Sequence, residues 1–271
     1  MRFPKYLPNV LIGATAVVLV GSRFVPGANQ PGPVVTAATS FITGDKSHET
    51  SAVASEGTGA VSLLTQTALA AFTGSVTKLS HPQALEDAFK SYFAYKTVHP
   101  DEIKKPYLYF VDYGLASTEP RGYVFDMSTL KVIDGPFTVA HGRGSSASQY
   151  GVPTMFSNTS NSHMTSLGLY VTRDTYGFHG HASGVAYSSI GLQLQGVSTG
   201  FNDNAANRRV VAHGAPYVTP TKAGRSEGCP AMEPARAQRL LPELADGAMV
   251  FLFAPNQNWL ANDPWVNGSA S

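Results

Sequence analysis

The sequence contains a single cysteine, Cys229, in 271 residues. An intramolecular disulfide is therefore excluded, and the thiol needs another reason to be there. A free cysteine is usually a small buried hydrophobic residue. The competing interpretation is a nucleophile, and that depends on the residues around it.

Charged residues are also scarce. Asp, Glu, Lys and Arg form 14% of the chain, and 19 basic against 18 acidic residues leave a net charge of +1. An ordinary soluble domain has about 25% charged residues. Proteins that neutralise nucleic-acid phosphates need a basic surface, so we expect no nucleic-acid partner.

The apolar run near the start of the chain is short. It covers Val10–Val20, 11 residues, and follows Arg2 and Lys5. A membrane-spanning helix needs about 20 apolar residues, whereas a secretory signal has about 7–15 after a short positive stretch. We expect residues 1–28 to be a signal peptide or a short membrane anchor. The body is then exported to the periplasm or another extracytoplasmic space.

Composition divides the rest of the chain into three parts. Residues 29–79 are rich in small and polar residues and read as a low-complexity linker, with a short helix near residues 60–72. Residues 80–255 form the main domain. It begins with a helix that has Ser80 as its N-cap and a buried stripe. The stripe consists of Leu85, Ala88, Phe89, Tyr92 and Phe93. Residues 256–271 form a polar tail.

After Pro106 the pattern changes to short aromatic and β-branched runs bounded by Gly, Pro, Asn or Ser, which is typical of strands. We expect a β-rich fold, a barrel or sandwich with a few helices, one of them at residues 233–245. The expected strands are residues 107–113, 123–127, 137–141, 167–172, 191–194, 209–213 and 249–254.

The residues with the clearest chemistry lie in two neighbouring segments. His213-Gly214 ends a predicted strand, and Ser226-Glu227-Gly228-Cys229 follows in a Ser/Gly-rich turn. A cysteine attacks as a thiolate, which a nearby histidine can generate. Gly228 permits the tight turn that would aim backbone N–H groups at an oxyanion. This pattern favours the nucleophile over the buried structural thiol.

Four ordered segments resemble the murein L,D-transpeptidase catalytic domain family, the YkuD-type enzymes that crosslink or trim peptidoglycan. They are VAHGRGSS (139–146), FSNTSNSHMTSLGLY (156–170), GFNDNAANRRVVAHGAPYV (200–218) and GRSEGCPAM (224–232). The resemblance implies an L,D-transpeptidase-like β-rich fold and peptidoglycan stem peptides as the partner, with no cofactor. It implies Cys229 as nucleophile, His213 as base and the backbone carbonyl of Gly214 as the group that orients the imidazole. It places Ser226 at a motif position that supports the loop or the donor substrate.

The sequence departs from the broader family around the cysteine. Glu227 stands where a histidine is frequent, and Pro230 where an arginine is frequent. That arginine would bind a substrate carboxylate or carbonyl, and Arg225 is a candidate replacement. A neutral carbonyl behind the histidine suits a thiol that is already acidic enough to lose its proton.

Several other side chains are candidates for the substrate cleft or, alternatively, for buried hydrogen bonds and packing. They are Tyr217, His141, His163, His179 and His181. The histidines lack the carboxylate-bearing spacing of a metalloprotease, so we expect no metal.

The leading hypothesis is an exported cysteine acyltransferase or peptidase, an L,D-transpeptidase or L,D-carboxypeptidase. The resemblance further implies that carbapenems acylate its cysteine. Two other classes stay open: a non-catalytic cell-wall binding or scaffold protein, and a histidine-based zinc peptidase.

Overall fold

The computed structural model describes residues 46–270, with side chains from residue 57. The expected signal peptide or anchor, residues 1–28, lies outside the described residues. None of the helices within 46–270 combines the length and the apolar character that a membrane crossing requires.

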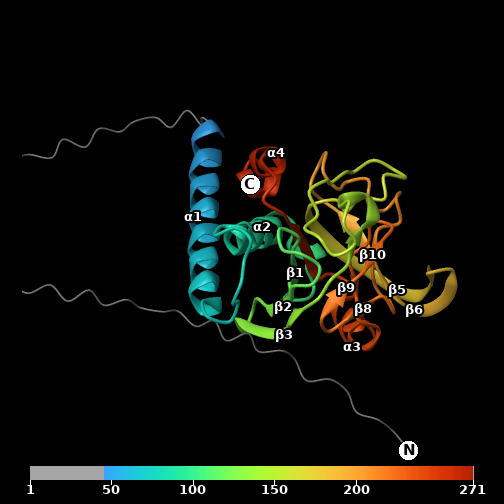
Figure 1. The fold of residues 1–271 in the computed structure, drawn as a ribbon. Helices are drawn as coiled ribbons and strands as arrows, with labels where there is room; N and C mark the ends of the chain where they lie inside the picture. The colour runs from blue at the N-terminus through green and yellow to red at the C-terminus, as the bar shows by residue number, and fades with distance from the viewer. Residues whose placement is uncertain (1–45, 271) are drawn as a thin grey trace, which may run out of the picture. The chain divides into compact units, whose positions relative to one another are not determined.

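In the described part of the chain, eight strands form one mixed sheet in the order β11-β7-β6-β5-β12-β1-β2-β3 (Figure 1). Two short ladders, β4–β10 and β8–β9, flank it. The β-rich class is confirmed. The bounds are β1 Tyr107–Asp112, β2 Gly122–Asp126, β3 Lys131–Phe137, β4 His141–Gly142, β5 Gly168–Ala182, β6 Val185–Gly196, β7 Val211–Gly214, β8 Val218–Thr219, β9 Lys222–Ala223, β10 Arg225–Ser226, β11 Ala231–Met232 and β12 Met249–Phe253.

Helices cover both faces of this sheet. On one face, Phe125 of β2 packs edge-on against Phe89 of α2 (Ala84–Val98), with ring centroids 5.4 Å apart. Tyr109 of β1 lies opposite Val124, the residue before Phe125, so its side chain points to the other face of the sheet. It stacks on Phe137, whose ring lies under Arg236 of α3 (Pro234–Leu244). The helix expected at residues 233–245 is thus confirmed, and it closes the core on the second face.

The first described element is longer than expected. Instead of a linker with a short helix, the chain forms α1, a 27-residue helix at Lys46–Phe72. Val61, Thr65, Ala68 and Phe72 are buried at helical spacing, and Figure 1 shows α1 alongside α2. Packing of such a stripe stabilises a helix whose local sequence gives little signal. Helix α1 belongs to the same compact unit as the main domain.

Helix α2 confirms the predicted stripe, since all five stripe residues are buried. The N-cap prediction for Ser80 is wrong. The helix begins at Ala84, and Ser80 donates from its backbone N and its Oγ to the carboxylate of Asp112, at 2.7 and 2.6 Å. The Ser80 hydroxyl is therefore bonded to the Asp112 carboxylate and does not cap the helix.

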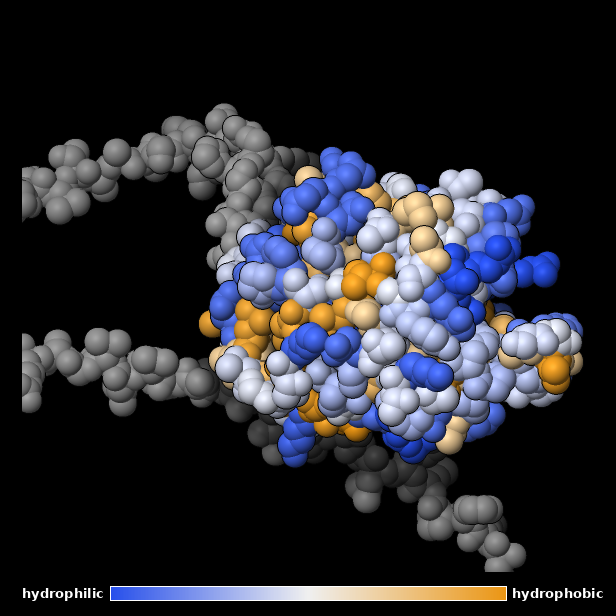
Figure 2. All heavy atoms as spheres, viewed as in Figure 1, coloured by the Kyte–Doolittle hydropathy of each residue, from blue (hydrophilic) through white to orange (hydrophobic). Residues whose placement is uncertain are grey.

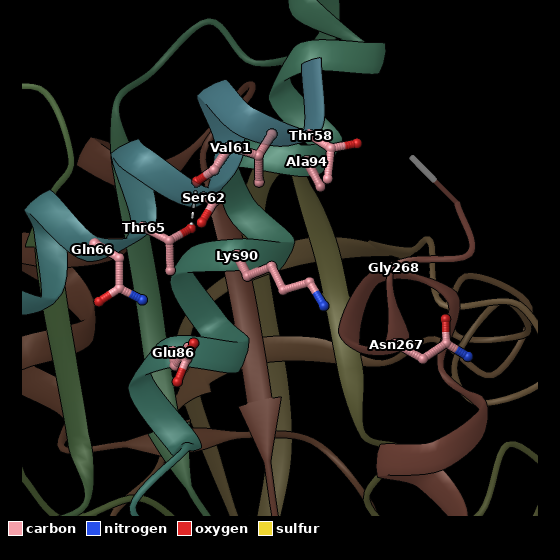
Figure 3. Close-up of a pocket in the computed structure, with 10 residues that line it drawn as sticks. All are labelled: Thr58, Val61, Ser62, Thr65, Gln66, Glu86, Lys90, Ala94, Asn267 and Gly268. Atoms are coloured by element: carbon pink, nitrogen blue, oxygen red, sulfur yellow. Dashed lines mark hydrogen bonds between the residues drawn. The ribbon is translucent and has the colours of Figure 1, made fainter. Parts of the chain in front are cut away.

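The expected polar tail packs onto the body. It forms α4 (Gln257–Asn262) and α5 (Pro264–Asn267), with Trp259 and Trp265 buried. The Asp263 carboxylate accepts from Trp259 Nε1 at 2.7 Å and from the first N–H groups of α5. A cavity of about 390 Å³ lies between α1, α2 and the end of α5, and Figure 3 shows the residues that line it. Beside it, Lys90 Nζ donates to Val266 O at 2.8 Å. This cavity contains none of the expected site residues.

Strands β5 and β6 run far beyond their predicted lengths of residues 167–172 and 191–194. They continue as a hairpin that projects from the body on the side away from α1 (Figures 1 and 2). Its tip residue Val185 is 69% exposed. Beyond Thr172 the hairpin residues up to Ile190 are exposed or half-buried, and Gly and Ser interrupt the apolar ones, so the pattern did not predict these strand extensions.

Candidate active site

Strand pairing brings the two motif segments together. Strand β7, which carries His213, pairs in parallel with β11, and Ala231 lies opposite His213. The backbone N of His213 also donates to Pro230 O at 3.3 Å. Cys229 immediately precedes this paired segment, so its loop ends beside the strand of the histidine. The expected juxtaposition of the two segments is therefore present in the fold.

The His213 imidazole is enclosed. The residue is 3% exposed, and its ring stacks on Phe178 of the β5–β6 hairpin, with centroids 4.1 Å apart and planes 18° apart. Burial lowers the pKa of His213 to about 4, although the Gly214 carbonyl acts in the opposite direction. Nδ1 lies 3.1 Å from Gly214 O. A carbonyl only accepts, so Nδ1 carries the proton and Nε2 is left with the lone pair of a general base.

The Cys229 thiol is held by backbone groups of the segment that enters β7. Val211 N donates to Sγ at 3.5 Å, and Sγ donates to Arg209 O at 3.9 Å. Burial raises the pKa of Cys229, the Val211 N–H and the Arg208 charge lower it, and the Glu227 charge raises it. Burial is the largest of these effects, so the structure does not support the expectation that the thiol is acidic enough to lose its proton unaided. A protonated thiol needs a base.

The turn before the cysteine is shaped by two short hydrogen bonds. Ser226 Oγ donates to Cys229 O at 2.7 Å and accepts from Gly228 N at 3.1 Å. Gly228 has φ +128°, and a Cβ there would lie 2.9 Å from Met164 O. Ser226 therefore supports the loop. The Gly228 N–H already has a partner, so the proposed oxyanion role would require that bond to open.

Cys229 opens into a cavity of about 460 Å³. The lining is polar, with two adjacent arginines and one carboxylate. It consists of Ser160, Asn161, His163, Asn207, Arg208, Arg209, Val210, Glu227 and Cys229. Of the expected cleft histidines, only His163 is among them. Its Nδ1 lies 2.5 Å from Glu227 Oε2, and Arg143 Nε contacts both oxygens of Glu227 at 2.9 Å.

His141 is a buried structural residue rather than a cleft residue. It is fully buried, and Arg121 Nη2 donates to its Nδ1 at 3.0 Å. Burial, together with the charges of Arg121 and Arg225, lowers the pKa of His141 to about 3. Arg121, also fully buried, donates to the carbonyls of Val139 and Leu115. The pair connects the segments before and after β2.

The remaining candidates lie outside this lining. His179 and His181 are exposed on the β5–β6 hairpin, and His179 Nδ1 lies 3.1 Å from Ser188 Oγ. Tyr217 packs edge-on against Tyr187 of the hairpin. Arg225 Nη1 donates to Ser146 O at 3.1 Å. Within residues 46–270, no group of three or more His, Cys, Asp or Glu side chains is arranged to hold a metal ion.

Three residues near the site gave no separate signal in the sequence: Phe178, Arg208 and Arg209. Arg208 donates to Ser157 O and Met164 O, both at 2.7 Å, and so fixes the loop that borders the cavity. The only hint was the Arg-Arg pair before β7, which reads equally well as surface charge.

A family model described as L,D-transpeptidase catalytic domain matches residues 77–253. The chain belongs to this family. The match includes both motif segments and the whole sheet, and starts shortly after α1. A search of curated proteins gives no match.

Among solved structures, the chain is similar to several L,D-transpeptidases. One from Mycobacterium smegmatis is 14% identical, covers 55% of this chain and 59% of its own, and has a TM-score of 0.32. One from Stackebrandtia nassauensis is 17% identical over 63% and 66%, with a TM-score of 0.34. A mutant of the Enterococcus faecium L,D-transpeptidase is 14% identical over 56% and 50%, also with a TM-score of 0.34. The chain thus spans about half to two thirds of these proteins.

Proposed function

We propose that this member of the L,D-transpeptidase catalytic domain family is a cysteine acyltransferase or peptidase acting on peptidoglycan stem peptides. The observation that carries the proposal is the strand pairing that brings the loop of a cavity-lining thiol beside the strand of a buried, neutral histidine. The Nδ1 proton of that histidine is fixed by Gly214. A buried structural cysteine would need neither feature.

The chemistry follows from these protonation states. The thiol proton moves to Nε2 of His213, and Sγ adds to the carbonyl carbon of an L,D peptide bond in the stem. The tetrahedral intermediate expels the amine of the terminal D-residue, which takes the proton from His213. The thioester then passes to an acceptor amine, giving a crosslink, or to water, giving a trimmed stem. In either case His213 removes a proton from the attacking group.

Arg208 stabilises the Cys229 thiolate that forms in this reaction. Its charge favours the thiolate, and its four hydrogen bonds to carbonyl and hydroxyl oxygens hold it in place. A fixed cation stabilises a developing anion without having to reorganise.

The proposal is tested by incubating purified protein with muropeptides and analysing the products by mass spectrometry. We expect crosslinked dimers, shortened stems or both with the wild type. We expect neither with Cys229→Ala or Cys229→Ser, whose circular dichroism should match the wild type. Unchanged muropeptides with the wild type, or full activity in Cys229→Ala, would reject the mechanism and favour the scaffold or zinc-peptidase class.

We also propose that the catalytic body is exported, on the strength of Arg2, Lys5 and the apolar run Val10–Val20. Residues 1–45, fused ahead of a reporter that is active only outside the cytoplasm, should produce activity. A matched fusion in which three valines of the run are replaced by aspartate should not. Reporter activity confined to the cytoplasm would contradict export.

A further inference from the structure

The wall beside the Cys229 thiol separates two cavities. The cavity of about 460 Å³ holds the thiol, and a second of about 410 Å³ lies against β5 and β6. Arg209 and Val210 line both. The Arg209 carbonyl accepts from the thiol. The Arg209 backbone thus contacts the sulfur, and Arg209 lines the same cavity as the thiol.

Arg209 is exposed and has an unusual backbone conformation. Its φ is +55°, in the left-handed region that a residue with a Cβ seldom adopts. The turn that ends at Arg209 is closed by hydrogen bonds from Arg209 N to Ala206 O and from Val210 N to Ala205 O. Residues with such a backbone cluster at binding and catalytic sites, where the surrounding structure maintains the strained conformation.

The charges around the two cavities do not cancel. The lining has three arginines, Arg173, Arg208 and Arg209, and a single carboxylate, Glu227. Glu227 is already paired with Arg143 and His163 on the rim.

The three arginines differ in what their side chains contact. Arg173 pairs with Glu102 at 3.2 Å. Arg208 donates only to neutral oxygens. Arg209 has no ion pair and no side-chain hydrogen bond among the described residues. Two arginines that line the cavity of the thiol, Arg208 and Arg209, are thus without a carboxylate partner among the described residues.

We propose that Arg209, with the charge of Arg208 behind it, forms a carboxylate-binding subsite beside Cys229. The subsite selects electrophiles that carry a carboxylate close to the reacting carbon. If the substrate is a stem peptide, which is an inference that rests on the proposed function, the bound group is a carboxylate of the donor next to the scissile bond. This role differs from the one expected for Arg225, whose guanidinium is directed to Ser146 O.

The test uses two thiol reagents that differ in charge and share a leaving group: neutral iodoacetamide and anionic iodoacetate. In both, Sγ forms a bond to the CH₂ carbon, the C–I bond breaks and iodide leaves. Both need the same thiolate, so the ratio of their rate constants cancels any change in the pKa of Cys229. The single cysteine ensures that each alkylation reports on this site.

We expect Arg209→Gln to lower the ratio of iodoacetate to iodoacetamide rates about fivefold, which corresponds to ~1 kcal/mol for a partly screened charge pair. Arg209→Lys should retain most of the ratio. Lys131→Gln is the matched charge control, because Lys131 is exposed on β3 at the opposite edge of the sheet. It should leave the ratio unchanged.

An unchanged ratio in Arg209→Gln overturns the proposal, and a fall in Arg225→Gln instead assigns the subsite to Arg225. If Arg209→Gln does not fold, the wild type provides the test. Raising the salt to about 0.5 M should slow iodoacetate more than iodoacetamide, because screening acts on the charged reagent alone, and equal slowing counts against the subsite. Neither reagent needs peptidoglycan, so a failed muropeptide assay leaves this outcome readable.

Discussion

Phe178 contributes to the burial of the His213 imidazole, and its removal tests the proposed base. Phe178 covers one face of the imidazole at 4.1 Å between centroids. In Phe178→Ala, water reaches that face. The burial that lowers the pKa of His213 to about 4 is then reduced, and the pKa rises toward its ordinary value, ~6.5.

The size of the effect follows from the two pKa values. A base with a pKa of about 4 is roughly 90% neutral at pH 5, whereas one with a pKa of about 6.5 is roughly 3% neutral, so full exposure costs about thirtyfold in rate. At pH 7 the same change costs less than about twofold. Loss of the ring contact itself destabilises the fold by about 0.5–1.5 kcal/mol.

The assay is the rate of acylation of Cys229 by a carbapenem between pH 4.5 and 8, followed by intact mass. In the plot of acylation rate against pH, we expect the fall in rate on the acid side (the acid limb) to move to higher pH in Phe178→Ala. The rate at pH 7 should stay close to that of the wild type. Phe178→Tyr keeps the ring and should keep the acid limb. Val185→Ala, at the exposed tip of the same hairpin, controls for general disturbance of the hairpin. Superimposable acid limbs in Phe178→Ala and wild type would show that the stacked ring does not set the basicity of His213.

The other predictions concern the thiol, the buried histidine and the turn. Arg208→Gln should shift the basic limb of Cys229 alkylation to higher pH, because the charge that lowers the thiol pKa is gone; an unshifted limb in the folded variant would exclude that role. His141 has a pKa of about 3 against an ordinary 6.5, so the unfolded chain binds the proton first and stability falls as the pH drops from about 6.5 to 3. His141→Gln should flatten this acid loss in urea titrations at pH 7 and 4.5, and an equally steep loss would show that other groups cause it. Gly228→Ala should lower stability and slow alkylation together, since its φ is +128° and Met164 O lies 2.9 Å from the new methyl group; a variant with wild-type melting temperature and alkylation rate would show that the turn tolerates a side chain.

The sequence was sufficient to predict those site residues that belong to short, local motifs. His213 and Cys229 belong to short motifs at the ends of strands, so pattern and resemblance were sufficient to find them. Phe178 reaches His213 only because β5 and β6 continue into a long hairpin, which the sequence did not predict. The same limit applies to α1, whose burial depends on a distant partner, α2.

The alternatives left open for the histidines were decided by tertiary packing. No local pattern distinguishes the cavity-lining His163 from His141, which a buried arginine holds inside the fold. The balance of charge at the thiol was also invisible in the sequence. It depends on burial, on a backbone N–H from Val211 and on the position of Arg208, none of which spacing specifies.

Phe178 and His213 lie on different strands, β5 and β7, and the position of the hairpin therefore affects the protonation of the histidine. Lifting the hairpin would separate Phe178 from His213 and wet the imidazole, so the open arrangement binds a proton more tightly than the closed one. By thermodynamic reciprocity, acidification favours the open hairpin, and a ligand that holds the hairpin down lowers the pKa of the base. Occupied and empty enzyme should therefore show different acid limbs, with the ligand-bound limb at lower pH.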